Sequence, residues 1–164
     1  MKITKLPPSR WQDYKNLRLE AVADSPQSFL HTVAETNAES DESWQEKITN
    51  MFFAVDDANK LVGMAGCYCD TREKLAHIAN VVSVYVSPEY RGKGVGRALL
   101  MAIIEDAKAK PQVKKLQLGV IITQAAAFKL YESLGFKKIG EQKMAVNVNG
   151  TFYDEYLMEM VLDR

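Results

Sequence analysis

Residues 84–100 read VYVSPEYRGKGVGRALL, in which an extended apolar run breaks at a proline and passes through three alternating glycines into a helix. The glycines at positions 92, 94 and 96 remove side chains from one short arc, so backbone N–H groups there can converge on an anion. The helix expected from about Gly94 directs its unsatisfied N–H groups and the positive end of its dipole to the same place. Arg91, Lys93 and Arg97 add positive charge. This stretch, which we call the glycine arc (residues 91–97), predicts a site for a pyrophosphate.

The spacing of these glycines excludes two commoner phosphate-binding loops. The arc contains no Gly-x-Gly-x-x-Gly, and no Lys-Ser or Lys-Thr pair follows its last glycine to hold a magnesium-bound nucleoside triphosphate. Taken alone, the arc is equally compatible with a glycine-rich turn that merely links a strand to a helix. The flanking sequence favours the phosphate site.

Two motifs carry a resemblance to a known family. Arg91, Gly94 and Gly96 match the pattern Gln/Arg-x-x-Gly-x-Gly/Ala, and the arc resembles the acyl-CoA-binding signature of the GCN5-related N-acetyltransferase (GNAT) family. Residues 130–136 read LYESLGF, which is similar to the Leu-Tyr-x-x-x-Gly-Phe segment of that family. The family usually has an asparagine six positions before this leucine, where the chain has Gln124. The resemblance covers roughly residues 51–162, and the two motifs together are far more specific than either alone.

The hydrophobic pattern predicts an α/β fold. A helix over residues 97–110 and a helical stripe ended by Gly135 flank a strand over residues 115–122. Further strands are expected over residues 3–6, 51–55, 61–68, 77–86, 143–148 and 152–162, with a hairpin turn at Asn149-Gly150. A helix ending near Asp24 is expected after a capping box formed by Ser9 and Gln12. The GNAT resemblance implies a mixed, mostly antiparallel central sheet, flanked by helices on both faces, with strands splayed at the acyl-CoA site.

The resemblance also implies roles for individual residues. The backbone of Tyr85 and Val86 would pair with the amides of pantetheine like an added strand, and a main-chain N–H there would bind the thioester oxygen. Tyr131 would act as the general acid that protonates the departing thiolate, the alternative being a residue that only packs on its helix. The predicted acyl-CoA-binding residues are Tyr85, Val86, Arg91, Gly92, Lys93, Gly94, Val95, Gly96, Arg97 and Gln124.

The general base and the acceptor pocket are less well marked. The family often uses a glutamate in the strand before the arc, but residues 77–85 contain no carboxylate, and Asn80 or Ser83 there could only position a water. Phe29, Glu35 and Trp44 are candidates for the acceptor pocket, since carboxylates beside an aromatic surface attract an amine. The alternative is that the acidic tract of residues 35–46 forms a solvated helical face anchored by Trp44.

Composition narrows the class of protein. At 164 residues and 47% apolar composition, the chain is expected to form a single domain over residues 1–164. Lys plus Arg equal Asp plus Glu at 21 each, which argues against a nucleic-acid binder. No apolar run is long enough to span a membrane and the amino terminus lacks the apolar core of a signal peptide, so no membrane association and a cytoplasmic location are expected. Cys67 and Cys69, without a nearby histidine, fall short of a metal-ligand set, so no metal is expected. A homodimer is left open.

The leading interpretation is an acetyl-CoA-dependent N-acetyltransferase that moves an acetyl group directly to a primary amine of a small molecule. Two alternatives remain open at this level: acetylation of a protein amino terminus or lysine, and a non-catalytic module that binds acyl-CoA. The identity of the acceptor amine depends on pocket shape, which sequence motifs do not encode.

Overall fold

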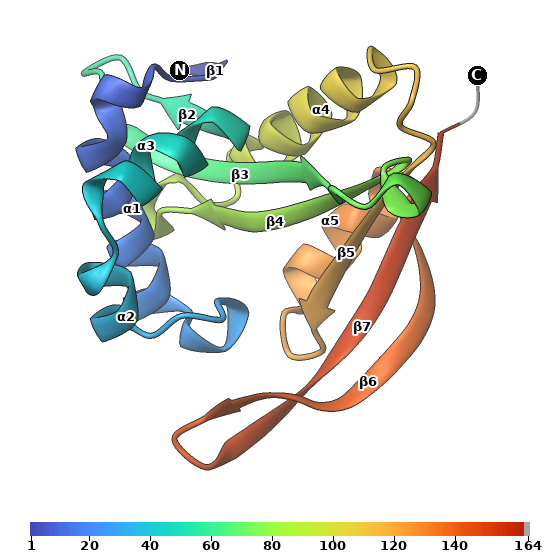
Figure 1. Cartoon of the computed structure of the whole chain (residues 1–164). Helices are drawn as coiled ribbons and strands as arrows, with labels where there is room; N and C mark the ends of the chain where they lie inside the picture. Colours follow the sequence, from blue (N-terminus) through green and yellow to red (C-terminus); the bar gives the residue numbers. More distant parts are fainter. Residues whose placement is uncertain (163–164) are drawn as a thin grey trace. The chain divides into compact units, whose positions relative to one another are not determined.

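The computed structural model describes residues 1–162, which form five α-helices and seven β-strands joined by short turns (Figure 1). The helices are α1 (Trp11–Asp24), α2 (Val33–Ala38), α3 (Asp41–Lys47), α4 (Val95–Lys108) and α5 (Ala125–Ser133). The strands are β1 (Lys2–Thr4), β2 (Met51–Val55), β3 (Leu61–Cys69), β4 (Ile78–Val86), β5 (Lys115–Ile121), β6 (Lys137–Val148) and β7 (Thr151–Val161). The strand order is β1-β2-β3-β4-β5-β7-β6, with β4–β5 parallel and the β1–β2, β2–β3, β5–β7 and β6–β7 pairs antiparallel. The predicted mixed, mostly antiparallel fold is confirmed.

The chain divides into two compact units. The first consists of Met1–Cys67 and Val82–Ile103, and the second consists of Tyr68–Val81 together with the residues from Ile104 onward. Strands β3 and β4 and helix α4 therefore contribute residues to both units.

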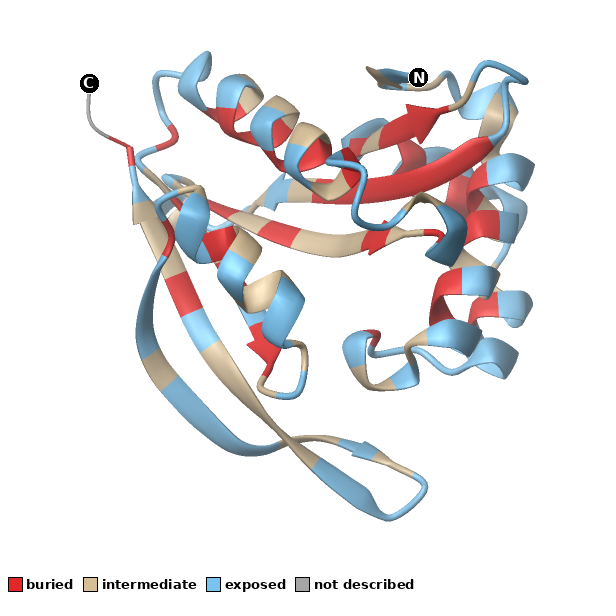
Figure 2. Cartoon of the chain, turned by 180° about the vertical axis from the view of Figure 1, so that it is seen from behind, coloured by how far each residue is buried: buried red, intermediate tan, exposed pale blue. Residues whose placement is uncertain are grey.

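The core of the first unit lies between its amino-terminal helices and its strands. Helix α1 buries Tyr14, Leu17, Ala21 and Val22, and these side chains join Trp44 of α3, Phe53 of β2 and Met64 of β3 in one cluster. Buried residues occupy most of β2 and the first two thirds of β3 in Figure 2. The apolar runs predicted at residues 51–55 and 61–68 are thus the central strands of this unit, as expected.

Helix α4 packs on the other face of β3. Side chains alternate between the faces of a strand, so Gly63 faces away from the side to which Met64 points. A Cβ at Gly63 would lie 3.1 Å from Leu99 Cδ1, 3.3 Å from Val95 Cγ1 and 3.2 Å from the backbone oxygen of Tyr85. Because position 63 has no side chain, the first turns of α4 can approach the sheet closely.

Gly63→Ala is expected to destabilise the protein by about 1–3 kcal/mol, because the added methyl meets a backbone atom and two packed side chains. Thermal denaturation measures the effect. Gly140→Ala in β6 is the matched control, because its Cβ would meet nothing nearer than Leu157 Cδ1 at 3.7 Å. A Gly63→Ala protein that melts at or above the wild-type temperature would contradict the close approach.

The second unit contains the long β6–β7 hairpin. Its turn is the predicted one: Asn149 and Gly150 have φ values of 50° and 86°, as a two-residue type I′ turn requires. Strand β6 begins at Lys137, six residues before the predicted start. The early part of β6 is polar, and its pairing with β7 from Lys137↔Glu159 onward makes it a strand. Much of β6 is exposed in Figure 2.

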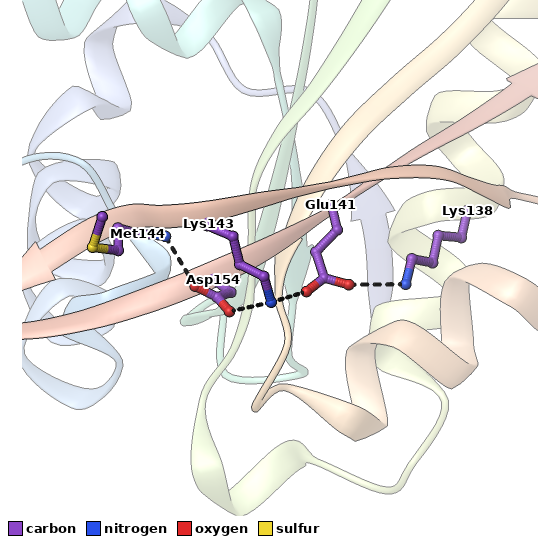
Figure 3. Close-up of polar contacts among 5 residues, drawn as sticks. All are labelled: Lys138, Glu141, Lys143, Met144 and Asp154. Carbon is purple, nitrogen blue, oxygen red and sulfur yellow. Dashed lines mark hydrogen bonds and ion pairs between the residues drawn. The ribbon is translucent and has the colours of Figure 1, made fainter.

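Ion pairs hold an irregular part of this hairpin. The β6–β7 register shifts between Gln142 and Val146, and Met144 has a φ of 49°. Figure 3 shows how Asp154 accepts a hydrogen bond from the Met144 N–H (2.9 Å) and pairs with Lys143 (3.0 Å), which also contacts Glu141. These contacts, the Met144 N–H bond first among them, hold the pKa of Asp154 below its usual value.

The capping box predicted at Ser9 and Gln12 is wrong. Helix α1 follows a short turn, Pro8–Arg10, and its N-cap Arg10 makes no side-chain capping bond. A complete capping box occurs instead at α2, where Thr32 and Glu35 exchange side-chain and backbone hydrogen bonds. A proline-initiated turn replaced the expected cap, because Pro8 already sets the φ of the first turn residue.

Candidate active site

The strand before the glycine arc ends in a well-anchored segment of the first unit. Tyr85 is 5% exposed, and Ser87 donates its N–H to the Val62 carbonyl at 2.9 Å. The Val86 carbonyl accepts a hydrogen bond from Arg91 Nε at 2.9 Å. The hydroxyl of Ser87 is buried without a hydrogen-bond partner in the described part of the chain. Hydrogen bonds to β3 and from Arg91 therefore hold the end of β4 immediately before the chain enters the arc.

The arc has the backbone conformation that its glycines predict. After the turn Pro88–Tyr90, Gly92 and Gly94 adopt φ values of 72° and 80°, a region that favours glycine. A Cβ at either position would meet nothing within 4 Å, so the space beside the arc is open. Gly94 accepts the first helical hydrogen bond, from Ala98 (3.0 Å), and the N–H groups of the first turn of α4 lack acceptors within the helix. An anion is the ligand that suits this arrangement.

The three predicted cations of the arc differ in their surroundings. Arg91 pairs with Asp24 at the end of α1, and its guanidinium lies 5.5 Å from the ring centroid of Tyr85. The hydrogen bond from Arg91 holds the pKa of Asp24 below its usual value. Arg91 thus ties the arc to α1 and to β4, and its contact with a phosphate stays a prediction. Lys93 and Arg97 are exposed, and the Lys93 ammonium lies 5.4 Å from the Tyr90 ring centroid.

Tyr131 lies on α5 in the second unit. It is 6% exposed, and its ring packs edge-on against Phe136 with centroids 5.9 Å apart. Burial raises the pKa of the Tyr131 phenol above its ordinary value. A phenol with a raised pKa carries its proton at neutral pH, which is the state that a proton donor requires.

Gln124 is the N-cap residue of α5. Its backbone is engaged, with the N–H donating to Ile121 (2.8 Å) and the carbonyl accepting from Phe128 (3.0 Å). Its side chain makes no capping hydrogen bond. The amide of Gln124 is therefore not used in capping its own helix.

The residues predicted for the acceptor pocket lie in different environments of the first unit. Phe29 is buried with its ring 6.2 Å from that of Tyr85. Glu35 is engaged in the capping box of α2. Trp44 is 1% exposed and lies in the hydrophobic core, edge-on to Tyr14 at 5.0 Å. Phe29 lies beside Tyr85 near the end of β4. An acceptor role for each of the three residues stays a prediction.

A polar cluster between α1 and β4 was not foreseen from the sequence. Arg18 donates a hydrogen bond to the Ser83 hydroxyl, and the Tyr85 hydroxyl donates to Glu20 at 3.2 Å. Ser83 has a φ of 57° in the middle of β4, a conformation uncommon for a residue other than glycine and typical of a strand irregularity. Burial, followed by the charge of Glu20, raises the pKa of Tyr85. The sequence contains little signal for this cluster, because an arginine such as Arg18, next to a buried residue of a helix that packs on a sheet, usually faces solvent.

The remaining strand residue considered for water positioning is already engaged. In the second unit, Asn80 Oδ1 accepts a hydrogen bond from Gln117 Nε2 at 2.7 Å. The parallel β4–β5 ladder runs from Ile78↔Lys115 to Asn80↔Gln117. Asn80 is therefore in the last pair of the β4–β5 ladder, and its side-chain oxygen is bonded to the residue that it pairs with.

Two further properties concern residues 1–162 as a whole. None of their helices combines the length and the apolar character needed to cross a membrane. No group of three or more His, Cys, Asp or Glu side chains in this range is arranged to hold a metal ion.

Comparison with solved structures identifies proteins that share this fold. The structure of yncA from Salmonella typhimurium, solved with its cofactor acetyl-CoA, superposes with a TM-score of 0.84 at 20% identity, covering 100% of this chain and 95% of that one.

Sequence comparisons identify related acetyltransferases and the family of this chain. The mycothiol acetyltransferase of Salinispora tropica is 32% identical over 122 residues, which are 74% of this chain but only 39% of that protein. The L-amino acid N-acetyltransferase AaaT of Escherichia coli is 26% identical over 155 residues, 92% of this chain and 93% of AaaT. The model of the acetyltransferase (GNAT) family matches residues 14–136, more than half of the chain. The protein therefore belongs to the acetyltransferase (GNAT) family, as its two motifs predicted.

Proposed function

We propose that the protein is an acetyl-CoA-dependent N-acetyltransferase that moves an acetyl group directly from acetyl-CoA to a primary amine of a small molecule. The observation that carries the proposal is the glycine arc, where Gly92 and Gly94 have positive φ beside open space and α4 begins at Val95. Membership of the GNAT family supports the proposal. The similarity to AaaT over nearly the whole of both chains favours a small amino compound as the acceptor.

In this proposal the first unit holds the CoA. The backbone of residues 92–97 and the start of α4 bind the pyrophosphate, and Lys93 and Arg97 balance its charge. Arg91 keeps the arc in place through Asp24 and Val86. The backbone of Tyr85 and Val86 pairs with the pantetheine amides, and a main-chain N–H at this strand end stabilises the thioester oxygen. Such preorganised donors are worth about 3 kcal/mol in a transition state.

Helix α5 carries Gln124 and Tyr131, the other two residues of the proposal. The side-chain amide of Gln124, which does not cap α5, can donate a hydrogen bond to the pantetheine or the pyrophosphate. When the amine nitrogen attacks, its bond to the acetyl carbon forms, the carbon–sulfur bond breaks, and the Tyr131 phenol gives its proton to the departing thiolate. The amine's proton passes to water.

A free-thiol assay tests the proposed function. Acetyl-CoA is offered with a panel of small amines and amino acids, and separately with peptides that carry a free amino terminus or a lysine. Thiol release with small amines supports the proposal. Release with peptides alone would assign the acceptor to proteins, and binding of acetyl-CoA without release for any amine would indicate a non-catalytic module.

Binding of acetyl-CoA is expected to raise the melting temperature. By mass action, a ligand at about 100 times its dissociation constant adds about 2.7 kcal/mol to the free energy of unfolding, which corresponds to roughly 5–10 °C for a chain of this size. Differential scanning fluorimetry measures the shift, with ATP at the same concentration as a control for non-specific phosphate binding. No shift with millimolar acetyl-CoA would contradict the assignment of the arc.

A further inference from the structure

Arg18 differs from other arginines of the chain in its partners. Arg10, Arg72 and Arg91 each donate to a carboxylate, those of Asp13, Asp70 and Asp24. Arg18 instead donates through Nη1 to the Ser83 hydroxyl, and its guanidinium lies 4.6 Å from the ring centroid of Phe29. Among the described residues no carboxylate forms an ion pair with Arg18.

The surroundings of Arg18 leave its charge poorly compensated. The side chain is half-buried, and desolvation lowers the pKa of Arg18 below its ordinary value. Glu39 and Tyr14 are the titratable groups that act on it, but Glu39 already pairs with Lys47 and accepts a hydrogen bond from Ser43. A guanidinium has five N–H donors in a planar fork, and here one of them has a protein acceptor. The arrangement has spare capacity for a planar anion.

Arg18 lies close to the strand end that is proposed to bind the thioester of acetyl-CoA. Its partner Ser83 stands two residues before Tyr85 in β4, whose backbone is assigned above to the thioester end of acetyl-CoA. The irregular φ of Ser83 accompanies the contact of its hydroxyl with α1. Phe29 lies against both Arg18 and Tyr85, with its ring 6.2 Å from the tyrosine ring. The guanidinium is thus placed beside the segment where the acceptor amine must arrive.

We propose that Arg18 binds a carboxylate of the acceptor, so that the acceptor is a primary amine that also carries a carboxylate, as an amino acid does. This inference rests on the proposed function, since it names the class of acceptor for the same site. A carboxylate on the guanidinium fork would replace the hydration that Arg18 loses on burial, whereas a simple amine would bring a second positive charge toward it. Arg18 is therefore a specificity-determining residue.

The experiment compares three matched acceptors: an amino acid, its carboxamide, and the amine that lacks the carboxyl group. The wild-type enzyme is expected to prefer the amino acid. Arg18→Met, which keeps the length and apolar contact of the side chain, is expected to raise the KM for the amino acid by about 10- to 100-fold, the loss typical of a charge-assisted hydrogen-bonded pair. KM for the other two acceptors should change little. Arg18→Lys, which keeps the charge without the fork, should fall between Arg18→Met and wild type.

Controls separate binding from folding. Arg72→Met removes one exposed arginine that pairs with Asp70 and should leave all three KM values unchanged. The acetyl-CoA-induced melting shift should be the same in Arg18→Met as in wild type. If Arg18→Met impairs the three acceptors equally, or if wild type uses the carboxamide as well as the amino acid, Arg18 has only a structural role and the inference is wrong.

A binding measurement distinguishes failure of this inference from failure of the proposed function. Calorimetric titration of the amino acid into CoA-saturated protein should give heat with wild type and much weaker binding with Arg18→Met. Turnover of amines without such Arg18-dependent binding would overturn the inference alone. Arg18-dependent binding with no thiol release for any amine would overturn the proposed transfer and keep the carboxylate site.

Discussion

Gly94→Asp is expected to weaken acetyl-CoA binding by at least about 100-fold while leaving most of the folding free energy intact. Two like charges 4 Å apart repel by about 4 kcal/mol at the effective dielectric constant of a protein surface, and tenfold in affinity corresponds to about 1.4 kcal/mol. The positive φ of Gly94 (80°) adds a cost of about 1–2 kcal/mol for an L-residue, which aspartate tolerates better than most. Calorimetric CoA affinity and thermal denaturation on the same variant measure both effects.

Two controls isolate the charge at the arc. Gly150→Asp places the same residue at a similar φ of 86°, also with nothing within 4 Å of its Cβ, in the β6–β7 turn. It should lose comparable stability and keep its CoA affinity. Gly94→Ala carries the backbone cost without the charge and should weaken binding less than Gly94→Asp. A Gly94→Asp protein with normal affinity and a collapsed fold would show that the arc is only a link between β4 and α4.

Tyr131→Phe is expected to lower the turnover number by about 100-fold or more, because it removes the proposed proton donor while keeping the ring that packs on Phe136. Affinity for acetyl-CoA should change little, so kcat and kcat/KM fall together. Tyr156→Phe is the matched control, since Tyr156 also packs an aromatic ring on α5, against Phe128 at 5.2 Å. It should retain near wild-type turnover.

The pH profile adds a second test of Tyr131. Burial raises its pKa above the ordinary tyrosine value near about 10, so the phenol stays protonated through neutral and mildly alkaline pH. Ionisation of Tyr131 should therefore cause no loss of wild-type activity below about pH 10. If Tyr131→Phe turns over within a few-fold of wild type while chemistry limits the rate, Tyr131 is a packing residue and the thiolate takes its proton from water.

Most of the fold could be predicted because its signals are local. The strands at residues 51–55, 61–69 and 78–86 are short apolar runs bounded by turn residues, and α4 carries a regular apolar stripe between the arc and Pro111. The hairpin turn needed only Asn149-Gly150, since both residues accept a positive φ. The first part of β6 escaped prediction, because its polar residues follow no period and become a strand only through pairing with β7.

In the candidate site, too, local features could be predicted from the sequence and contacts between distant residues could not. The glycine arc is visible in the sequence because the positive φ values at positions 92 and 94 favour glycine there, and φ is a property of the local backbone. The partner of Arg91 is not visible in the sequence, because Asp24 lies 67 residues away along the chain. Trp44 shows the same limit, because an isolated aromatic in an acidic tract can face a pocket or the core, and only packing places it at 1% exposure.

The sequence by itself determined the family, the order of strand, arc and helix, and the type of residue at each motif position, because each depends on spacing within a few neighbouring residues. The tertiary structure alone decided which side chains meet across the chain. Arg18 and Ser83 are 65 positions apart in the sequence. Their contact exists because α1 packs on the sheet through its buried residues Tyr14, Leu17 and Ala21. This packing directs Arg18 toward Ser83, where β4 is irregular. Helix packing and strand register, which no local pattern encodes, thus set the charge beside the proposed acceptor site.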